Sequence, residues 1–237
     1  MKQQFPETRW SLILRVSQTD TSARSDALGE LCSTYWFPVY AFVRGQGYSP
    51  EDAQDLTQDF FARVLEDSLF DRADPARGRM RSFLLGILKN VIAHQWESEQ
   101  TKKRGGQYSF ICIDQAAAER QWQESLSTGV TPENEFDRQW AVAVFNAAFT
   151  KLESHFASLN KQSMFEELKS SVAWNSNEDA YEVVAQRLGM TEAAVGVAVY
   201  RMRKRYRQLL ETEILETLAS PEELADEIRY LTSVLSR

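Results

Sequence analysis

The sequence predicts an all-α fold in which two small helical domains are joined by a linker. Apolar residues recur every three or four positions along nearly all of the 237 residues, and no convincing pair of alternating strands is present. Helix-starting signals precede several of these periodic segments. Residues 107–135 interrupt the pattern with Ser, Gln and Thr, so this stretch is the linker candidate. With 43% hydrophobic residues, the chain can form one sizeable core or two small ones.

The first helical domain is expected over residues 1–104. Residues 27–43 predict a mostly buried helix, which Pro38 should bend or interrupt. Ser49 and Pro50 then mark a helix start, as the cap and the first helical residue. A turn-rich connection at 71–79 leads to a third helix over 81–96.

The helix that begins at Pro50 is amphipathic. Its apolar stripe runs from Ala53 through Leu56 and Phe60 to Val64 and Leu65. The opposite face carries polar side chains that solvation alone would explain: Asp55, Gln58, Asp59 and Arg63.

The second helical domain is expected over residues 133–218, after a linker at 105–132 in which Trp122 suggests docking. Residues 181–207 within it read as a helix-turn-helix. Ala185 is small enough for a close helix crossing, Gly189 supplies the tight turn, and Val195 packs the second helix back on the first.

The second helix of this motif is capped and strongly basic. Thr191 is the expected N-cap, and Glu192 suits the positive end of the helix dipole. Five cations follow within seven residues: Arg201, Arg203, Lys204, Arg205 and Arg207. Such a helix can enter the DNA major groove. The alternative is an ordinary helical hairpin with a solvated charged face.

A helical extension is expected over residues 219–237. Ser220 and Pro221 start it, and Leu224, Ile228, Leu231 and Leu235 form its apolar stripe. The extension could be regulatory or could cover the apolar back of the second domain. We favour packing, because amphipathic surface helices usually bury their stripe in their own domain.

Charge is segregated along the chain. The formal net charge of −7 argues against a general nucleic-acid coat protein, so any DNA contact must come from local patches. Residues 72–104 hold eight Lys and Arg against three acids, whereas acids concentrate at 51–67 and 211–227. This pattern fits a basic DNA-facing surface and acidic surfaces for other contacts.

The remaining sequence signals are negative. Cys32 and Cys112 lie far apart and suggest a reducing cytoplasm, while a signal peptide and an apolar run of membrane-spanning length are both missing. His94 and His155 lack partners at metal-ligand spacing. Because no catalytic set or phosphate-cradling Gly loop occurs, we expect no enzymatic activity, no cofactor and no metal.

Together these features resemble a known family. The first module resembles region 2 of bacterial RNA polymerase sigma factors through residues 55–61, 78–84 and 89–90. The second is similar to region 4 through residues 181–207. The short connection between them resembles the extracytoplasmic-function (ECF) subfamily. Residues 5–11, residues 103–106 and the tail after Ser220 are similar to its planctomycete-like branch.

The resemblance implies partners and roles. Asp55, Gln58, Asp59 and Arg63 would bind the β′ coiled coil of core RNA polymerase, within a complex that also includes the β subunit. The −10 promoter element would be contacted by Arg81, Lys89, Asn90, His94 and Trp96. The −35 element would be contacted by Glu192, Tyr200, Arg201, Arg203, Lys204, Arg205 and Arg207. Such a protein initiates transcription in the cytoplasm, and an anti-sigma factor is a candidate further partner.

The chain departs from the ECF pattern at two places. Gly196, Val197 and Ala198 stand where Lys, Arg or another polar residue is common, and His94 stands where an acid is common. Base readout is therefore expected to shift to Glu192, Tyr200, Arg201 or Arg203, with DNA shape contributing. The alternative function is a stand-alone helix-turn-helix regulator with an N-terminal sensor or dimerisation module.

Overall fold

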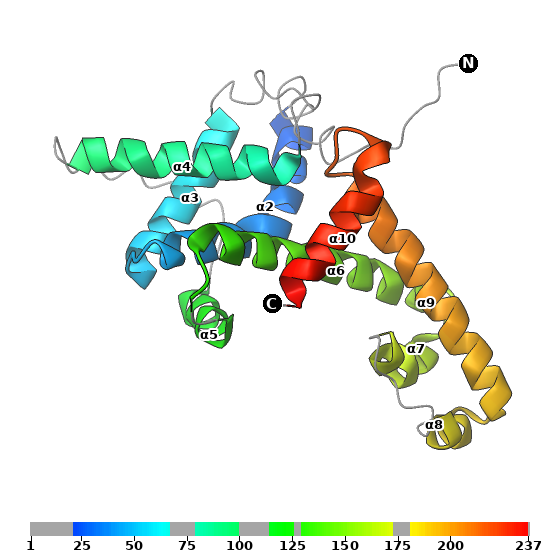
Figure 1. Cartoon of the computed structure of the whole chain (residues 1–237). Helices are drawn as coiled ribbons and strands as arrows, with labels where there is room; N and C mark the ends of the chain where they lie inside the picture. Colours follow the sequence, from blue (N-terminus) through cyan, green and yellow to red (C-terminus); the bar gives the residue numbers. More distant parts are fainter. Residues whose placement is uncertain (1–20, 67–78, 100–113, 126–128, 173–180, 237) are drawn as a thin grey trace, which may run out of the picture. The chain divides into compact units, whose positions relative to one another are not determined.

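The computed structural model describes residues 21–66, 79–99, 114–125, 129–172 and 181–236. Within these ranges the secondary structure is helical and contains no strand, which confirms the all-α prediction (Figure 1). The predicted motifs at 5–11 and 103–106, the connection at 71–78 and Cys112 lie outside the described residues.

The structure divides into two compact units. Unit 1 comprises Met1–Ala143 and Ile214–Arg237, and unit 2 comprises Val144–Glu213. This division differs from the predicted domains, because the tail and the start of the helix after the linker both group with the first module. Helices α6 (Pro132–Ser158) and α9 (Glu192–Leu215) each contribute to both units, since the boundaries fall within them.

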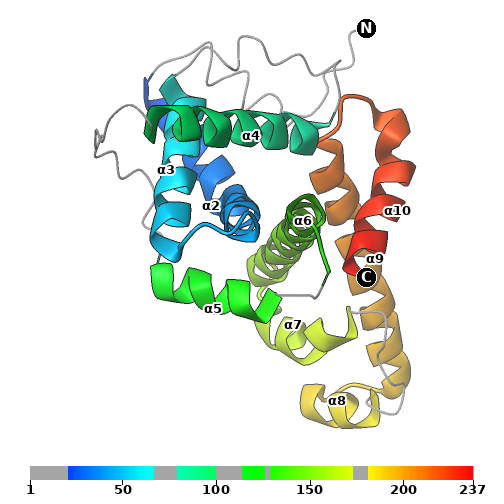
Figure 2. The same cartoon turned by 60° about the vertical axis from the view of Figure 1, so that its left-hand side comes forward.

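Three helices form the centre of unit 1. They are α2 (Thr21–Gly45), α3 (Pro50–Glu66) and α4 (Met80–Glu99); α2 packs on α3, and α3 packs on α4. In Figure 2, helices α3 to α6 surround α2. Pro38 lies inside α2 and does not interrupt it. The Ser49 hydroxyl accepts a hydrogen bond of 3.1 Å from the Asp52 backbone N–H, which confirms the predicted cap of α3.

The core of unit 1 follows the predicted stripes. Side chains from all three helices are buried, with aromatic residues prominent among them: Tyr35, Val39, Phe42, Ala53, Leu56, Phe60, Val64, Leu84, Leu88 and Val91. The first half of α6 completes this core. Its Trp140 ring stacks on Tyr35 with ring centroids 4.0 Å apart, and Phe136 meets Phe42 edge-on.

Part of the expected linker is an ordered helix, α5 (Gln115–Ser125), which the sequence analysis missed. The Asp114 carboxylate caps it by accepting a hydrogen bond from the Ala117 N–H. Trp122 is buried, as its predicted docking requires. Glu119 accepts hydrogen bonds from the Arg44 guanidinium and the Tyr40 hydroxyl, which tie α5 to α2. The high polarity of α5 hid its short apolar stripe from periodicity analysis.

The C-terminal helix belongs to unit 1, where its side chains meet Arg81 near the start of α4 and Asp137 of α6; the sequence analysis favoured packing on the back of the second domain. Ser220 caps a single 3-10 turn, Pro221–Glu223, which leads into α10 (Leu224–Leu235). The buried side chains of α10 are Glu227, Leu231 and Val234. Leu235 is exposed, so the predicted stripe was correct at Leu231 and wrong at its end.

Unit 2 has its own core. It contains the later part of α6, α7 (Gln162–Leu168), a 3-10 turn Lys169–Ser171, α8 (Tyr181–Leu188) and most of α9. The buried cluster draws on all four helices: Leu152, Phe165, Leu168, Val172, Ala185, Val195, Val199 and Met202. Ala185 and Val195 lie in this cluster, as the helix-crossing prediction requires. The core therefore holds α8 and the start of α9 in one compact arrangement.

Candidate functional site

The polar face of α3 lies opposite its buried stripe. Asp55 is exposed, while Gln58, Asp59 and Arg63 are partly buried. Leu56 and other apolar residues of the same helix fill the unit 1 core. The structure thus places the four predicted polymerase-binding residues on one helix, and Asp55 is the most accessible of the four.

Helix α4 presents three of its predicted DNA-contacting residues to solvent. Lys89, Asn90 and His94 are all exposed, whereas the Trp96 side chain lies outside the described residues. The Lys89 Nζ pairs with the Glu133 carboxylate at 2.8 Å, and both side chains stay nearly half exposed. The hydrogen bond from Lys89 lowers the pKa of Glu133. Lys89 therefore must exchange this partner before it can hold a phosphate.

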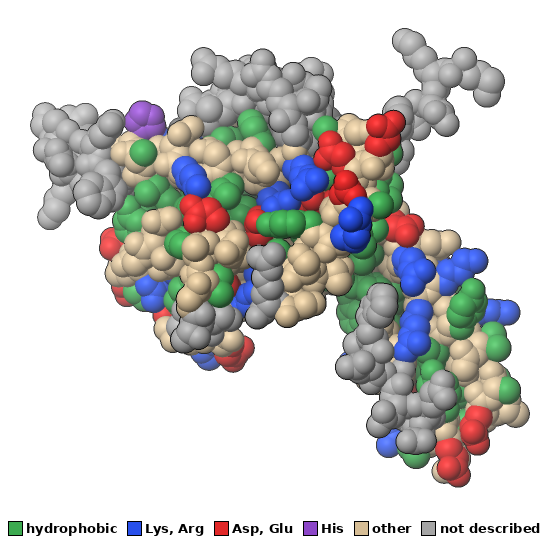
Figure 3. Space-filling model, viewed as in Figure 1, with side chains coloured by type: hydrophobic (Ala, Val, Ile, Leu, Met, Phe, Trp, Pro, Cys, Tyr) green, Lys and Arg blue, Asp and Glu red, His purple; other side chains and the backbone are tan. Residues whose placement is uncertain are grey.

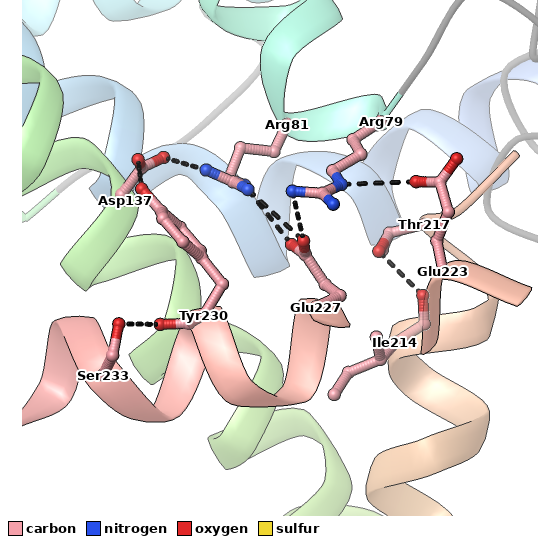
Figure 4. Close-up of polar contacts among 9 residues, drawn as sticks. All are labelled: Arg79, Arg81, Asp137, Ile214, Thr217, Glu223, Glu227, Tyr230 and Ser233. Carbon is pink, nitrogen blue, oxygen red and sulfur yellow. Dashed lines mark hydrogen bonds and ion pairs between the residues drawn. The ribbon is translucent and has the colours of Figure 1, made fainter. Parts of the chain in front are cut away.

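Arg81 does not join that surface, and the prediction that it contacts DNA needs correction. Its side chain is only 8% exposed, with Nη1 2.7 Å from Asp137 and Nη2 3.3 Å from Glu227. Its guanidinium carbon also lies 4.4 Å from the centroid of the Tyr230 ring (Figure 4). A cation enclosed by two carboxylates and an aromatic ring is a structural group.

The acids around Arg81 form one network with Arg79. Glu227 is 1% exposed and pairs with the Arg79 Nη1 at 2.9 Å, while the Arg79 Nε lies 3.3 Å from Glu223. The Tyr230 hydroxyl donates to Asp137. Burial disfavours the charged form of Arg81, but Asp137 and Glu227 outweigh it and raise its pKa. Two acids of the tail therefore neutralise the two arginines at the start of α4.

Unit 2 contains the predicted pair of helices joined by a tight turn. Gly189 has a φ of +63° between α8 and α9, a conformation that glycine adopts without steric cost. The Thr191 hydroxyl accepts a 3.2 Å hydrogen bond from the Ala194 N–H, which confirms it as the cap of α9. The two helices, the tight turn and the cap therefore lie where the sequence predicts them.

The cations of α9 differ in exposure. Arg201, Lys204 and Arg207 are exposed, and Arg205 is partly buried. The Arg203 Nε donates to the Ser171 carbonyl at 2.8 Å, so this exposed side chain also braces the unit 2 core. Figure 3 shows the Lys and Arg side chains gathered along α9. The structure thus leaves four exposed cations on the predicted DNA-facing helix, of which Arg203 is also bonded to the Ser171 carbonyl.

The first two turns of α9 carry an exposed apolar residue that the sequence analysis did not treat as functional. Val197 is 50% exposed, and Tyr200, which was a predicted site residue, is 67% exposed. Glu192 is exposed at the helix start. The sequence did contain a signal that could have identified Val197. Residues 196–198 depart from the ECF pattern, in which Lys, Arg or another polar residue is common there.

None of the described helices combines the length and apolar character needed to cross a membrane. In the same part of the chain, no three His, Cys, Asp or Glu side chains gather as metal ligands would.

Comparison with known proteins identifies part of unit 1. Residues 35–102 match the family model for sigma-70 region 2, a segment that includes the end of α2 and all of α3 and α4. No curated protein and no solved structure gives a significant match. The resemblance of the first module to region 2 is therefore confirmed, and the match supports placing the chain in the sigma-70 family.

Proposed function

We propose that this chain is an ECF-type sigma factor that binds core RNA polymerase and directs initiation through contacts with the −10 and −35 promoter elements. The observation that carries the proposal is the region 2 match over residues 35–102. A sigma-70 region 2 supports a role in polymerase binding and promoter melting.

The polymerase contact is assigned to the polar face of α3. Asp55, Gln58, Asp59 and Arg63 lie on a helix whose other side is fixed in the core, so the face is held rigidly for a partner. Residues on a rigid element lose little conformational freedom on binding. The occupant proposed for this face is the β′ coiled coil.

The −10 contact is assigned to the exposed side of α4. Lys89 can hold a phosphate, while Asn90 can form hydrogen bonds with an unpaired base. Exposure of Asn90 and His94 supports this assignment. Trp96 follows on the same helix and would provide a stacking surface for an extruded base. Arg81 is left out, since it is buried in its ion-pair network.

The −35 contact is assigned to α9. Its start follows the Gly189 turn, and Arg201, Lys204 and Arg207 are exposed further along the helix. A helix presented in this way fits the major groove, with phosphates held by the cations. The protein is expected to act in the cytoplasm, without catalysis of its own.

Reconstitution with core polymerase tests the proposal. The full chain should bind core enzyme and give promoter-specific run-off transcripts. The Asp55→Lys, Asp59→Lys double variant should lose most of the core affinity while keeping its circular dichroism spectrum. A matched double variant, Glu124→Lys with Glu222→Lys, changes the same charge at exposed positions of unit 1 and should bind normally.

Two outcomes would contradict the assignments. Wild-type affinity in the folded Asp55→Lys, Asp59→Lys variant would remove α3 from the interface. Tight, specific duplex binding by the isolated chain at physiological salt, without any core binding, would favour a stand-alone regulator. The net charge of −7 makes such binding unfavourable, because it repels phosphates at long range.

A further inference from the structure

The start of α9 has two apolar faces, and only one of them belongs to the core. Val195, Val199 and Met202 are buried in the unit 2 cluster. Ala193, Val197 and Tyr200 follow one another at steps of four and three residues, so they share the opposite face of the helix. All three are exposed. We call these three residues the exposed stripe.

Cations continue the exposed stripe along the helix. Arg201 lies four residues after Val197, Lys204 lies four after Tyr200, and Arg207 lies three after Lys204. All three cations are exposed, and Figure 3 shows the basic side chains of this helix next to apolar ones. The same helix face is therefore apolar in its first two turns and basic in the turns that follow. Its charge complements a polyanion.

We infer that the exposed stripe reads the 5-methyl groups of thymines in the −35 element, while Arg201, Lys204 and Arg207 hold the flanking backbone. This inference rests on the proposed function, in which α9 enters the major groove. The thymine methyl is the apolar group on the major-groove edge of a base pair. A valine side chain has no hydrogen-bonding group and can contact this methyl only by apolar packing.

The local backbone supports close contact at this place. Gly196 precedes Val197 and adds no side chain to the helix surface, so the stripe can approach the bases closely. A β-carbon at Gly196 would meet only the Tyr181 ring, at 3.9 Å. The absence of a polar side chain at 196–198 also leaves no base-edge donor to compete with methyl contact at these positions.

Removing the methyl groups alone tests the inference. A −35 element is first selected from a randomised library with the holoenzyme, and its thymines are then replaced one by one with deoxyuridine, which pairs identically but lacks the methyl. Holoenzyme affinity should fall about threefold to fourfold at each contacted thymine, as expected for one apolar group returned to water. The Val197→Ala variant should bind the thymine and uracil elements about equally at the position that Val197 contacts.

A control variant is available in the same unit. Leu159 is also 50% exposed, but it follows the end of α6 and lies outside α9. The Leu159→Ala variant should keep the wild-type response to deoxyuridine. Circular dichroism and core binding of both variants should match the wild type.

The outcomes separate this inference from the proposed function. If the holoenzyme binds the selected −35 element no more tightly than a scrambled one, α9 does not read DNA and the proposed function is wrong. If the holoenzyme still prefers the selected element by the same factor after every thymine is replaced with deoxyuridine, only the methyl readout is wrong. If Val197→Ala keeps the full thymine preference, or weakens core binding without DNA, the stripe serves another purpose and the inference is overturned.

Discussion

The arginines at the start of α4 and those along α9 are alike in sequence and opposite in surroundings. Arg81 is 8% exposed between Asp137 and Glu227, whereas Arg201 and Arg207 are exposed on their helix. The first set is neutralised by acids from α6 and the tail. The second set keeps its charge available for phosphates. A basic run in the sequence is therefore not enough to predict a surface that holds phosphates, because the fold decides which of its cations are buried against acids.

The acidic tail supplies carboxylates that neutralise the first set of arginines. Glu223 and Glu227 belong to the acid-rich segment 211–227, which the sequence analysis assigned to contacts with other molecules. Instead they pair with Arg79 and Arg81 inside unit 1. The charge segregation seen along the chain is thus partly cancelled in space, because opposite segments meet within one unit.

The largest expected effect comes from breaking the buried network. Arg81→Ala should lower the free energy of unfolding by about 3 kcal/mol, because it leaves the largely buried Asp137 without its cation and leaves Glu227 with Arg79 alone. Urea unfolding followed by tryptophan fluorescence measures it. If the alanine variant does not fold, Glu227→Gln tests the same network with the side-chain volume kept. It should also destabilise the protein.

Arg201→Ala is the matched control for this experiment. It removes an exposed cation and should change the free energy of unfolding by no more than about 0.5 kcal/mol. Equal destabilisation by Arg81→Ala and Arg201→Ala would contradict the contrast between the two sets of arginines.

The second expected effect appears in DNA binding. Replacing Tyr200 should change which −35 sequences are preferred, at about 1–3 kcal/mol for each lost base contact. Replacing Arg207, further from the helix start, should weaken all −35 sequences about equally and reduce the salt slope by roughly one. Transcription from a randomised −35 library measures both. A preference change in the Arg207→Ala variant alone would show that α9 is placed wrongly in the groove.

Gly189, in the turn before α9, and Gly196, within α9, should respond oppositely to replacement by alanine. Gly189→Ala should destabilise unit 2 by about 1–2 kcal/mol, because its φ of +63° is costly for a residue with a β-carbon. Gly196→Ala should stabilise it by about 0.5–1 kcal/mol through higher helix propensity. Thermal unfolding of the two variants compares them directly. A shift of the same sign in both would contradict the proposed backbone roles.

The smallest expected effect is on pH dependence in unit 1. The hydrogen bond from Arg44 lowers the pKa of Glu119 from its ordinary 4.5 to about 2. Stabilisation by this pair is therefore complete above about pH 5 and lost as the pH falls toward 2, because the unfolded chain then binds the additional proton. Solvent screening of the pair keeps the effect at about 1 kcal/mol or less.

Glu119→Gln should flatten this part of the stability profile relative to the wild type. The control is Glu124→Gln, which alters an exposed carboxylate on the same helix and should leave the profile unchanged. Parallel wild-type and Glu119→Gln profiles between pH 5 and pH 2 would mean that the Arg44 pair contributes no stability.

The sequence by itself determined the helices and their starts. Ser49, Thr191 and Ser220 cap helices through hydrogen bonds to residues two or three positions away, so local chemistry suffices to predict them. The same holds for the positive φ of Gly189 and for the spacing that buries Ala185 and Val195. These features depend on neighbours within a few turns.

Only the tertiary structure determined which charges are free and what the tail covers. Arg81 meets Asp137 and Glu227 across 56 and 146 residues of sequence, and such pairings leave no periodic signal. The packing of the tail left no signal for the same reason, because its partners lie on distant helices. Burial converts a basic side chain from a ligand for DNA into part of a core, and burial is a property of the folded unit.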